Sequence, residues 1–284
     1  MKSSWMIVAS LLFAIMGVFV KLGSAYFSSA ELVFYRSAIG LLVIFAIVRV
    51  QKLPLATPHI TAHVWRGLSG FFALMLFFYA ISALPLATAV TLNYTAPLFL
   101  AVLLTVFLRE KPSWEVIGAL LLGFSGVVLL LRPSLPSDQV NAGLMGLASG
   151  LLAGIAYFNV SQLGKQGEPA WRVVFYFTVV STLGAGAWML FHTFQPVTWR
   201  QLPILLGLGI SATLAQLAMT HAYRVGKTLV VGSLAYTTVV IASLLGILFW
   251  DEWLSTLSWI GMSLIVTSGI LSVLWTQRAS SIVK

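Results

Sequence analysis

The side chains that could carry chemistry in this sequence are polar groups embedded in long apolar stretches. The clearest is Arg36, near the start of the apolar stretch 30–49. A charge in such a stretch is costly to desolvate, so it usually faces protein or a water-filled cavity. Two interpretations stay open. Arg36 contacts an acidic group of a solute or pairs with Glu31 at a gate, or it is structural, bonding backbone carbonyls or reaching toward the surface.

Two matching groups of polar and aromatic residues lie elsewhere in the apolar stretches. One holds Asn93 and Tyr94, and the other holds Ser233, Tyr236 and Thr237, whose spacing of three and four residues places them on one helix face. Amide and aromatic groups suit a planar or amphipathic organic solute better than a bare ion. Hydrogen bonding between helices is the alternative, and it is favoured for the smaller hydroxyls. Further candidates for the same cavity are Tyr79, Tyr157, Asn159, Gln162, Gln216 and His221.

Enzymatic and cofactor chemistry find no support in these residues. Cysteine is absent, so thiol chemistry and Cys-ligated metals are excluded. No His and Asp constellation lies within the apolar stretches, and the acidic residues fall at their ends or between them. The phosphate-binding pattern Gly-x-x-x-x-Gly-Lys-Ser/Thr does not occur, so ATP is not expected to drive any activity. We therefore predict no enzyme, no catalytic residue, no metal and no cofactor.

The composition indicates a membrane protein. Hydrophobic residues make up 60% of the 284 residues and charged residues 8%, whereas soluble proteins have about 45–50% apolar and about 25% charged residues. The net charge of +9 comes from Lys and Arg scattered between apolar runs. Such a pattern is typical of loops that follow the positive-inside rule. We therefore expect the lipid bilayer as a partner and no nucleic acid.

The elements that must position these side chains are about ten apolar stretches. Each approaches the roughly 20 residues that a helix needs to cross a bilayer. The first is expected to be a retained helix and not a signal peptide. The predicted fold class is an all-α membrane protein with ten transmembrane helices. The predicted spans are 4–23, 30–49, 66–83, 87–107, 114–132, 142–162, 171–193, 203–222, 227–249 and 255–275.

The distribution of Lys and Arg predicts the orientation in the membrane. With a cytoplasmic N-terminus, twelve of them, including Arg66, fall on the cytoplasmic side. Three, Lys21, Arg132 and Arg200, fall on the other side, and Arg36 lies within a span. Because cytoplasmic loops carry an excess of Lys and Arg, we predict a multi-pass protein of the cell inner membrane with both termini in the cytoplasm.

The two halves of the chain, 1–135 and 136–284, can be aligned with each other. Residues 78–95 pair with residues 220–237 at a constant shift of 142. Five helices per half is an odd number, so the second half would cross the membrane in the opposite sense. Inverted repeats of this kind are common in transporters, because two such halves can exchange inward-open and outward-open shapes. A duplicated structural bundle without transport is the alternative.

Each half also has a stretch of small and polar residues, then a Glu at its end, then an apolar stretch interrupted by glycines. In the first half these residues are Tyr94-Thr95-Ala96-Pro97, Glu110, Gly118, Gly123 and Gly126, and in the second they are Tyr236-Thr237-Thr238, Glu252, Gly261 and Gly269. In these features the chain resembles the ten-helix EamA-type members of the drug/metabolite transporter superfamily. Val239 stands where the first half has Pro97, so a helix break there is not expected to be repeated.

The resemblance implies a central cavity between the halves and a small organic solute as substrate. Within that superfamily, the sequence looks most like the carriers of S-adenosylmethionine and related organic metabolites. We therefore expect a secondary or facilitative transporter of an amino acid or a nucleoside- or nucleotide-like solute that works by alternating access. A multidrug or organic-cation exporter of the same fold is the alternative, and a structural or channel protein is a weaker one. A monomer and a homodimer are both compatible with the sequence.

Overall fold

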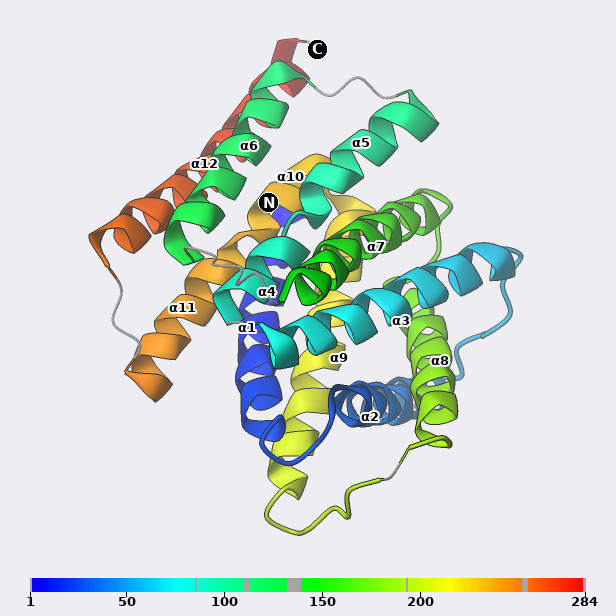
Figure 1. Ribbon diagram of the computed structural model, residues 1–284. Coiled ribbons are helices and arrows are strands. Elements are labelled where there is room, and N and C mark those ends of the chain that lie inside the picture. Colours follow the sequence, from blue (N-terminus) through cyan, green and yellow to red (C-terminus); the bar gives the residue numbers. More distant parts are fainter. Residues whose placement is uncertain are drawn as a thin grey trace.

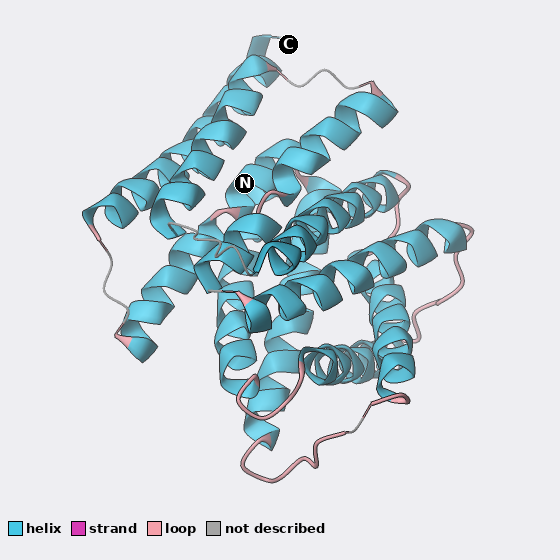
Figure 2. Ribbon diagram, viewed as in Figure 1, coloured by secondary structure: helices cyan, strands magenta, loops and turns pink. Residues whose placement is uncertain are grey.

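A computed structural model describes residues 2–84, 86–109, 113–131, 139–192, 194–251 and 255–282, and these residues form helices without strands (Figures 1 and 2). Glu110, Arg132 and Glu252, which the sequence analysis named, lie outside them. After a short 3₁₀ turn at Lys2–Ser4, the helices are α1 (Trp5–Gly23), α2 (Ser29–Val50), α3 (Ile60–Ala83), α4 (Leu86–Asn93), α5 (Ala96–Leu108), α6 (Trp114–Leu131), α7 (Val140–Lys165), α8 (Ala170–Met189), α9 (Leu202–Val225), α10 (Thr228–Ala235), α11 (Thr237–Trp250) and α12 (Thr256–Ile282).

Eight segments of the described chain are long and apolar enough to cross a membrane. They coincide with eight of the ten predicted spans. The other two, 114–132 and 255–275, correspond to shorter apolar helices over Trp114–Leu129 and Thr256–Ser272. Many large apolar side chains on the outer faces of the helices are exposed, as expected where helices contact lipid.

Two predicted spans are not single helices. The span 87–107 divides into α4 and α5 at Tyr94 and Thr95, and the span 227–249 divides into α10 and α11 at Tyr236. At both divisions the bonding tightens to a 3₁₀ pattern, because the Thr95 amide donates to Leu92 O and the Tyr236 amide donates to Ser233 O, each at 3.3 Å.

The expectation that such a break is not repeated was wrong. Tyr94 and Tyr236 occupy equivalent positions at the shift of 142 residues. Pro97 lacks an N–H and so weakens the first helix here. The second break has no proline and consists of a single 3₁₀ turn at Tyr236, whose backbone stays in the right-handed helical region.

The largest helix contacts join the two halves. α3 packs along α7, α1 along α9, α2 along α8 and α6 along α12, and these neighbours can be followed in Figure 1. Gly146, Gly150 and Gly154 recur every four residues along α7 and permit a close approach of the α4–α5 segment. A Cβ at Gly150 would overlap Thr95 Oγ1 and lie 2.6 Å from Leu92 O, so the first helix break rests directly on α7.

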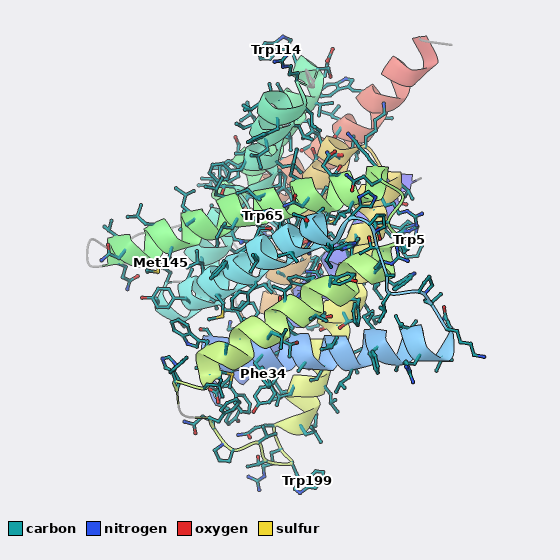
Figure 3. All side chains as sticks on the ribbon, turned by 90° about the vertical axis from the view of Figure 1, so that its right-hand side faces the viewer. Trp5, Phe34, Trp65, Trp114, Met145 and Trp199 are labelled. Carbon is teal, nitrogen blue, oxygen red and sulfur yellow. The ribbon has the colours of Figure 1, made fainter. Side chains whose placement is uncertain are left out.

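The start of α1 and the end of α12 lie toward the same side of the molecule. In the side view of Figure 3, Trp5 and the last turns of α12 (red) lie at the right, whereas Met145, near the start of α7, lies at the left. The first and seventh helices therefore start from opposite sides.

Candidate functional site

A cavity of about 320 Å³ lies between helices from both halves of the chain. This is within the usual range for pockets that hold small organic ligands. Its walls come from α1, α3, α4, α7 and α11, with single residues from α2, α8 and α9. Much of the lining is apolar and aromatic, including Phe13, Leu74, Phe77 and Phe78.

Two arginines stand out against this lining. Arg36 on α2 is 3% exposed and Arg66 on α3 is 2% exposed, and both line the cavity. Their guanidinium carbons lie 5.7 and 4.2 Å from the centre of the Phe177 ring on α8. The two positive charges therefore lie near the same ring, which stabilises each of them in part through its π-electrons. We call Arg36 and Arg66 the arginine pair.

The arginine pair is only partly satisfied by its surroundings. Arg66 Nη2 donates to Gln216 Oε1 at 3.2 Å. The Nε atoms of both arginines have no hydrogen-bond partner within the described part of the chain. None of the described residues that line the cavity is an aspartate or a glutamate. A buried guanidinium stays charged, so the cavity holds two cationic groups without an acidic counterpart.

Glu31 does not serve as the partner of Arg36. Its Oε2 accepts the amide of Ser28 at 2.8 Å in a capping box at the start of α2. Its Oε1 accepts the amide of Gln195 at 2.6 Å. Both oxygens therefore fix helix and loop backbone, and the predicted gate between Arg36 and Glu31 is not formed.

Five of the predicted site residues do line the cavity: Arg36, Asn93, Tyr94, Tyr157 and Gln216. Asn93 Nδ2 donates to Ser149 Oγ on α7 at 3.1 Å, so this contact also ties α4 to α7.

Seven others lie outside the lining: Tyr79, Asn159, Gln162, His221, Ser233, Tyr236 and Thr237. Tyr79 lies at a separate surface hollow with Tyr26 and Trp188, and His221 packs edge-on against Trp5 at 5.2 Å. Ser233 donates to Leu229 O at 3.1 Å, and Tyr236 is fully buried at the helix break.

Two lining residues that form the core of the site, Arg66 and Phe177, were not proposed as cavity residues from the sequence. Arg66 was counted among the cytoplasmic charges because it stands at the beginning of an apolar run. α3 begins six residues earlier, at Ile60, so Arg66 lies nearly two turns inside the helix. The polar residues Thr61 and His63 hid that start. The turn at Tyr236 places Thr238, and not Thr237, toward the cavity.

The cavity reaches one end of the bundle and is closed at the other. Lys21, Ser24 and Trp250, at the last turns of α1 and α11, belong to its lining, and Lys21 Nζ lies 4.2 Å from the Trp250 ring centre. The opposite end is closed by a buried cluster that includes Ala9, Leu104, Leu163 and Ala222. We call this cluster the apolar seal. Tyr157 of the cavity stacks on Tyr223 of the seal at 5.5 Å.

A polar cluster joins the α2–α3 connection to the α7–α8 connection. Glu168 accepts hydrogen bonds from Thr57 and from Arg172 Nη1, the latter at 2.9 Å, and lies 3.4 Å from His63 Nε2. Arg172 Nη2 also donates to Pro54 O at 2.8 Å. Burial raises the pKa of Glu168. The hydrogen bonds from Thr57 and Arg172 and the charge of Arg172 outweigh this effect, so the pKa lies below its ordinary value.

Comparison with solved structures supports the architecture. One crystal structure superposes with a TM-score of 0.82 over 98% of this chain and 99% of that chain, at 20% sequence identity. At this identity the likeness concerns the fold.

Comparison with known sequences gives relatives over almost the whole chain. The pseudopaline exporter CntI of Pseudomonas aeruginosa is 32% identical over 264 residues, which covers 93% of each protein. An S-adenosylmethionine uptake transporter of Rickettsia bellii is 23% identical over 262 residues, which covers 89% of this chain and 86% of that protein. The model of the EamA-like transporter family matches residues 2–132 and 141–274. The chain therefore is a multi-pass membrane protein that belongs to the EamA-like transporter family.

Proposed function

We propose that this protein carries a small organic metabolite across the inner membrane by alternating access, as a secondary or facilitative transporter. The observation that carries the proposal is a cavity built from both halves, which reaches one end of the bundle and is closed by the apolar seal at the other. A carrier needs this asymmetry, because its site must face one side at a time. A channel would need a continuous path.

The proposal includes the orientation and the repeat. With both termini in the cytoplasm, the ends of α1 and α11 face outward, so the structure represents an outward-facing shape. The helix contacts support an inverted repeat: α1 against α9 and α3 against α7 are equivalent pairs when the halves are exchanged, and α2 against α8 and α6 against α12 map onto themselves. The cavity lies within one chain, so a monomer is sufficient and a homodimer remains compatible.

The relatives restrict the substrate only to small organic solutes. One exports pseudopaline and another takes up S-adenosylmethionine, so they differ both in solute and in direction. The organic-cation alternative is disfavoured by the cationic lining of the cavity.

The test is uptake into proteoliposomes containing the purified chain, with S-adenosylmethionine, glutamate and AMP as labelled probes. Gly17 lines the cavity and has open space where a Cβ would stand. A phenylalanine there would fill the solute path, so Gly17→Phe should reduce saturable uptake by about tenfold or more. Gly118→Phe is the matched control, because Gly118 on α6 is exposed outside the cavity and also has open space. Uptake that Gly17→Phe leaves unchanged would show that the cavity is not the path.

A further inference from the structure

We infer that the arginine pair is a binding site for the acidic end of the carried solute, and that this solute is an organic dianion: a dicarboxylate or a phosphate monoester attached to an apolar or planar body. This inference rests on the proposed function, because it names the substrate class of the same cavity. The inference could not be made from the sequence, which identified Arg36 but not Arg66 as a site residue.

The first step is electrostatic. Removing a guanidinium from water without an acidic partner is costly, and two in one cavity also repel each other. Both lie against the same Phe177 ring, so their guanidinium carbons are no farther apart than the sum of those two distances. The ring and the Gln216 amide offset only part of the cost. A bound anion would supply the missing negative charge.

The second step concerns the number of charges. The described lining has no carboxylate, so a monoanion would leave one arginine uncompensated. A group with two negative charges would neutralise the pair. Guanidinium groups bind carboxylate and phosphate oxygens through two parallel N–H bonds, and both Nε atoms lack a partner within the described residues. Two carboxylates or one phosphoryl group would each supply the two negative charges.

The third step concerns the rest of the ligand. Beyond the arginine pair the lining is mostly aromatic and aliphatic, with Phe13, Leu74 and Phe77 among it. Such walls favour a body with apolar faces. The arginine pair gives this lining a positive charge, and a cationic lining raises the local concentration of anions.

The experiment measures binding to the purified full chain in detergent by calorimetry and thermal shift. The probes are phthalate and phenyl phosphate as dianions, benzoate as a monoanion and phthalamide as a neutral compound of similar shape. We expect the dianions to bind about tenfold or more tightly than benzoate. Preference for phthalate would identify the dicarboxylate as the source of the charge, and preference for phenyl phosphate would identify the phosphate.

Arg36→Gln and Arg66→Gln should each weaken dianion binding about tenfold or more, to the level of benzoate, and leave phthalamide unchanged. The control is Arg49→Gln, because Arg49 is an exposed arginine on the same helix as Arg36 and should have no effect. Since each change removes a buried charge, the melting temperature should not fall. Arg36→Lys and Arg66→Lys keep the charge without the forked donor and should bind dianions with intermediate affinity.

Dianions that bind no better than benzoate, or that do not bind at millimolar concentration, would overturn the inference. So would arginine variants that weaken phthalamide as much as phthalate. The proposed function fails separately. Dianion binding without flux in proteoliposomes would remove the transport proposal and leave the site. Saturable flux of neutral solutes that is unchanged in Arg36→Gln would overturn the arginine site and leave the transport proposal.

Discussion

Gly70 and Gly17 both line the cavity but differ in what a methyl group would meet. A Cβ at Gly70 would overlap Nη1 of Arg66 and lie 2.9 Å from Cε2 of Phe177. A Cβ at Gly17 meets nothing within 4 Å. Because Nη1 is the far end of a flexible side chain, Gly70→Ala should displace the guanidinium, with a small shift of the Phe177 ring, and leave the helix intact.

We therefore predict that Gly70→Ala weakens phthalate binding about tenfold while the melting temperature changes little. Gly17→Ala is the matched control and should bind phthalate as the unmodified protein does. Calorimetry on the two variants checks both. Equal affinity in both variants would show that the position of Arg66 does not matter for anion binding.

Single residues also show how far sequence reasoning reached. Arg36 was identifiable because a charge within an apolar run is expensive wherever the helix ends lie. Arg66 was not, because its burial depends on where α3 begins. Phe177 is one of many aromatic residues in the chain and became notable only because two guanidinium groups lie near its ring.

At the scale of elements, the contact between the α2–α3 and α7–α8 connections should depend on pH. The pKa of Glu168 is lower in the folded protein than its ordinary value. Between the two values the unfolded chain binds more protons, so this group stabilises the fold above its ordinary pKa of about 4.3. That contribution is lost as the pH falls through the lowered folded value.

Unfolding of the purified protein, followed between pH 7 and pH 3, checks this point. Glu168→Gln should lower the stability at pH 7 by about 1–3 kcal/mol, because Arg172 loses a charged acceptor. Between pH 7 and pH 3, Glu168→Gln should lose less stability than the unmodified protein does. Asp251→Asn removes an exposed carboxylate at the end of α11 and keeps a residue type that tolerates the positive φ of this position, so it should leave both quantities nearly unchanged. A parallel acid response in the unmodified protein and Glu168→Gln would contradict the assignment.

The helix breaks show the limit of sequence reasoning at this scale. Hydropathy located the spans 87–107 and 227–249 because their composition is uniformly apolar. It could not reveal the breaks, since a 3₁₀ turn changes the hydrogen bonding without changing the hydropathy. Only Pro97 carried a local signal, and Tyr236 carried none. The repeat itself held the missing information, because the two breaks occur at equivalent positions.

At the scale of the whole molecule, the proposed mechanism requires the cavity and the apolar seal to exchange access. Gly17 and Ala9 both lie on α1, eight residues or about 12 Å apart along the helix axis. Gly17 lines the cavity, whereas Ala9 is fully buried in the seal. The chain has no cysteine, so a single introduced thiol reports on one position without background.

A membrane-impermeant maleimide should therefore label Gly17→Cys from the side of the α1 C-terminus and leave Ala9→Cys unlabelled. Addition of a solute that the proteoliposome assay shows to be carried should populate the opposite shape. Labelling of Gly17→Cys should then fall several-fold, and Ala9→Cys should become reactive from the other side. Labelling of both positions from both sides at once would indicate a continuous channel. An Ala9→Cys that stays protected in every condition would indicate that the seal does not open, and would contradict alternating access through this cavity.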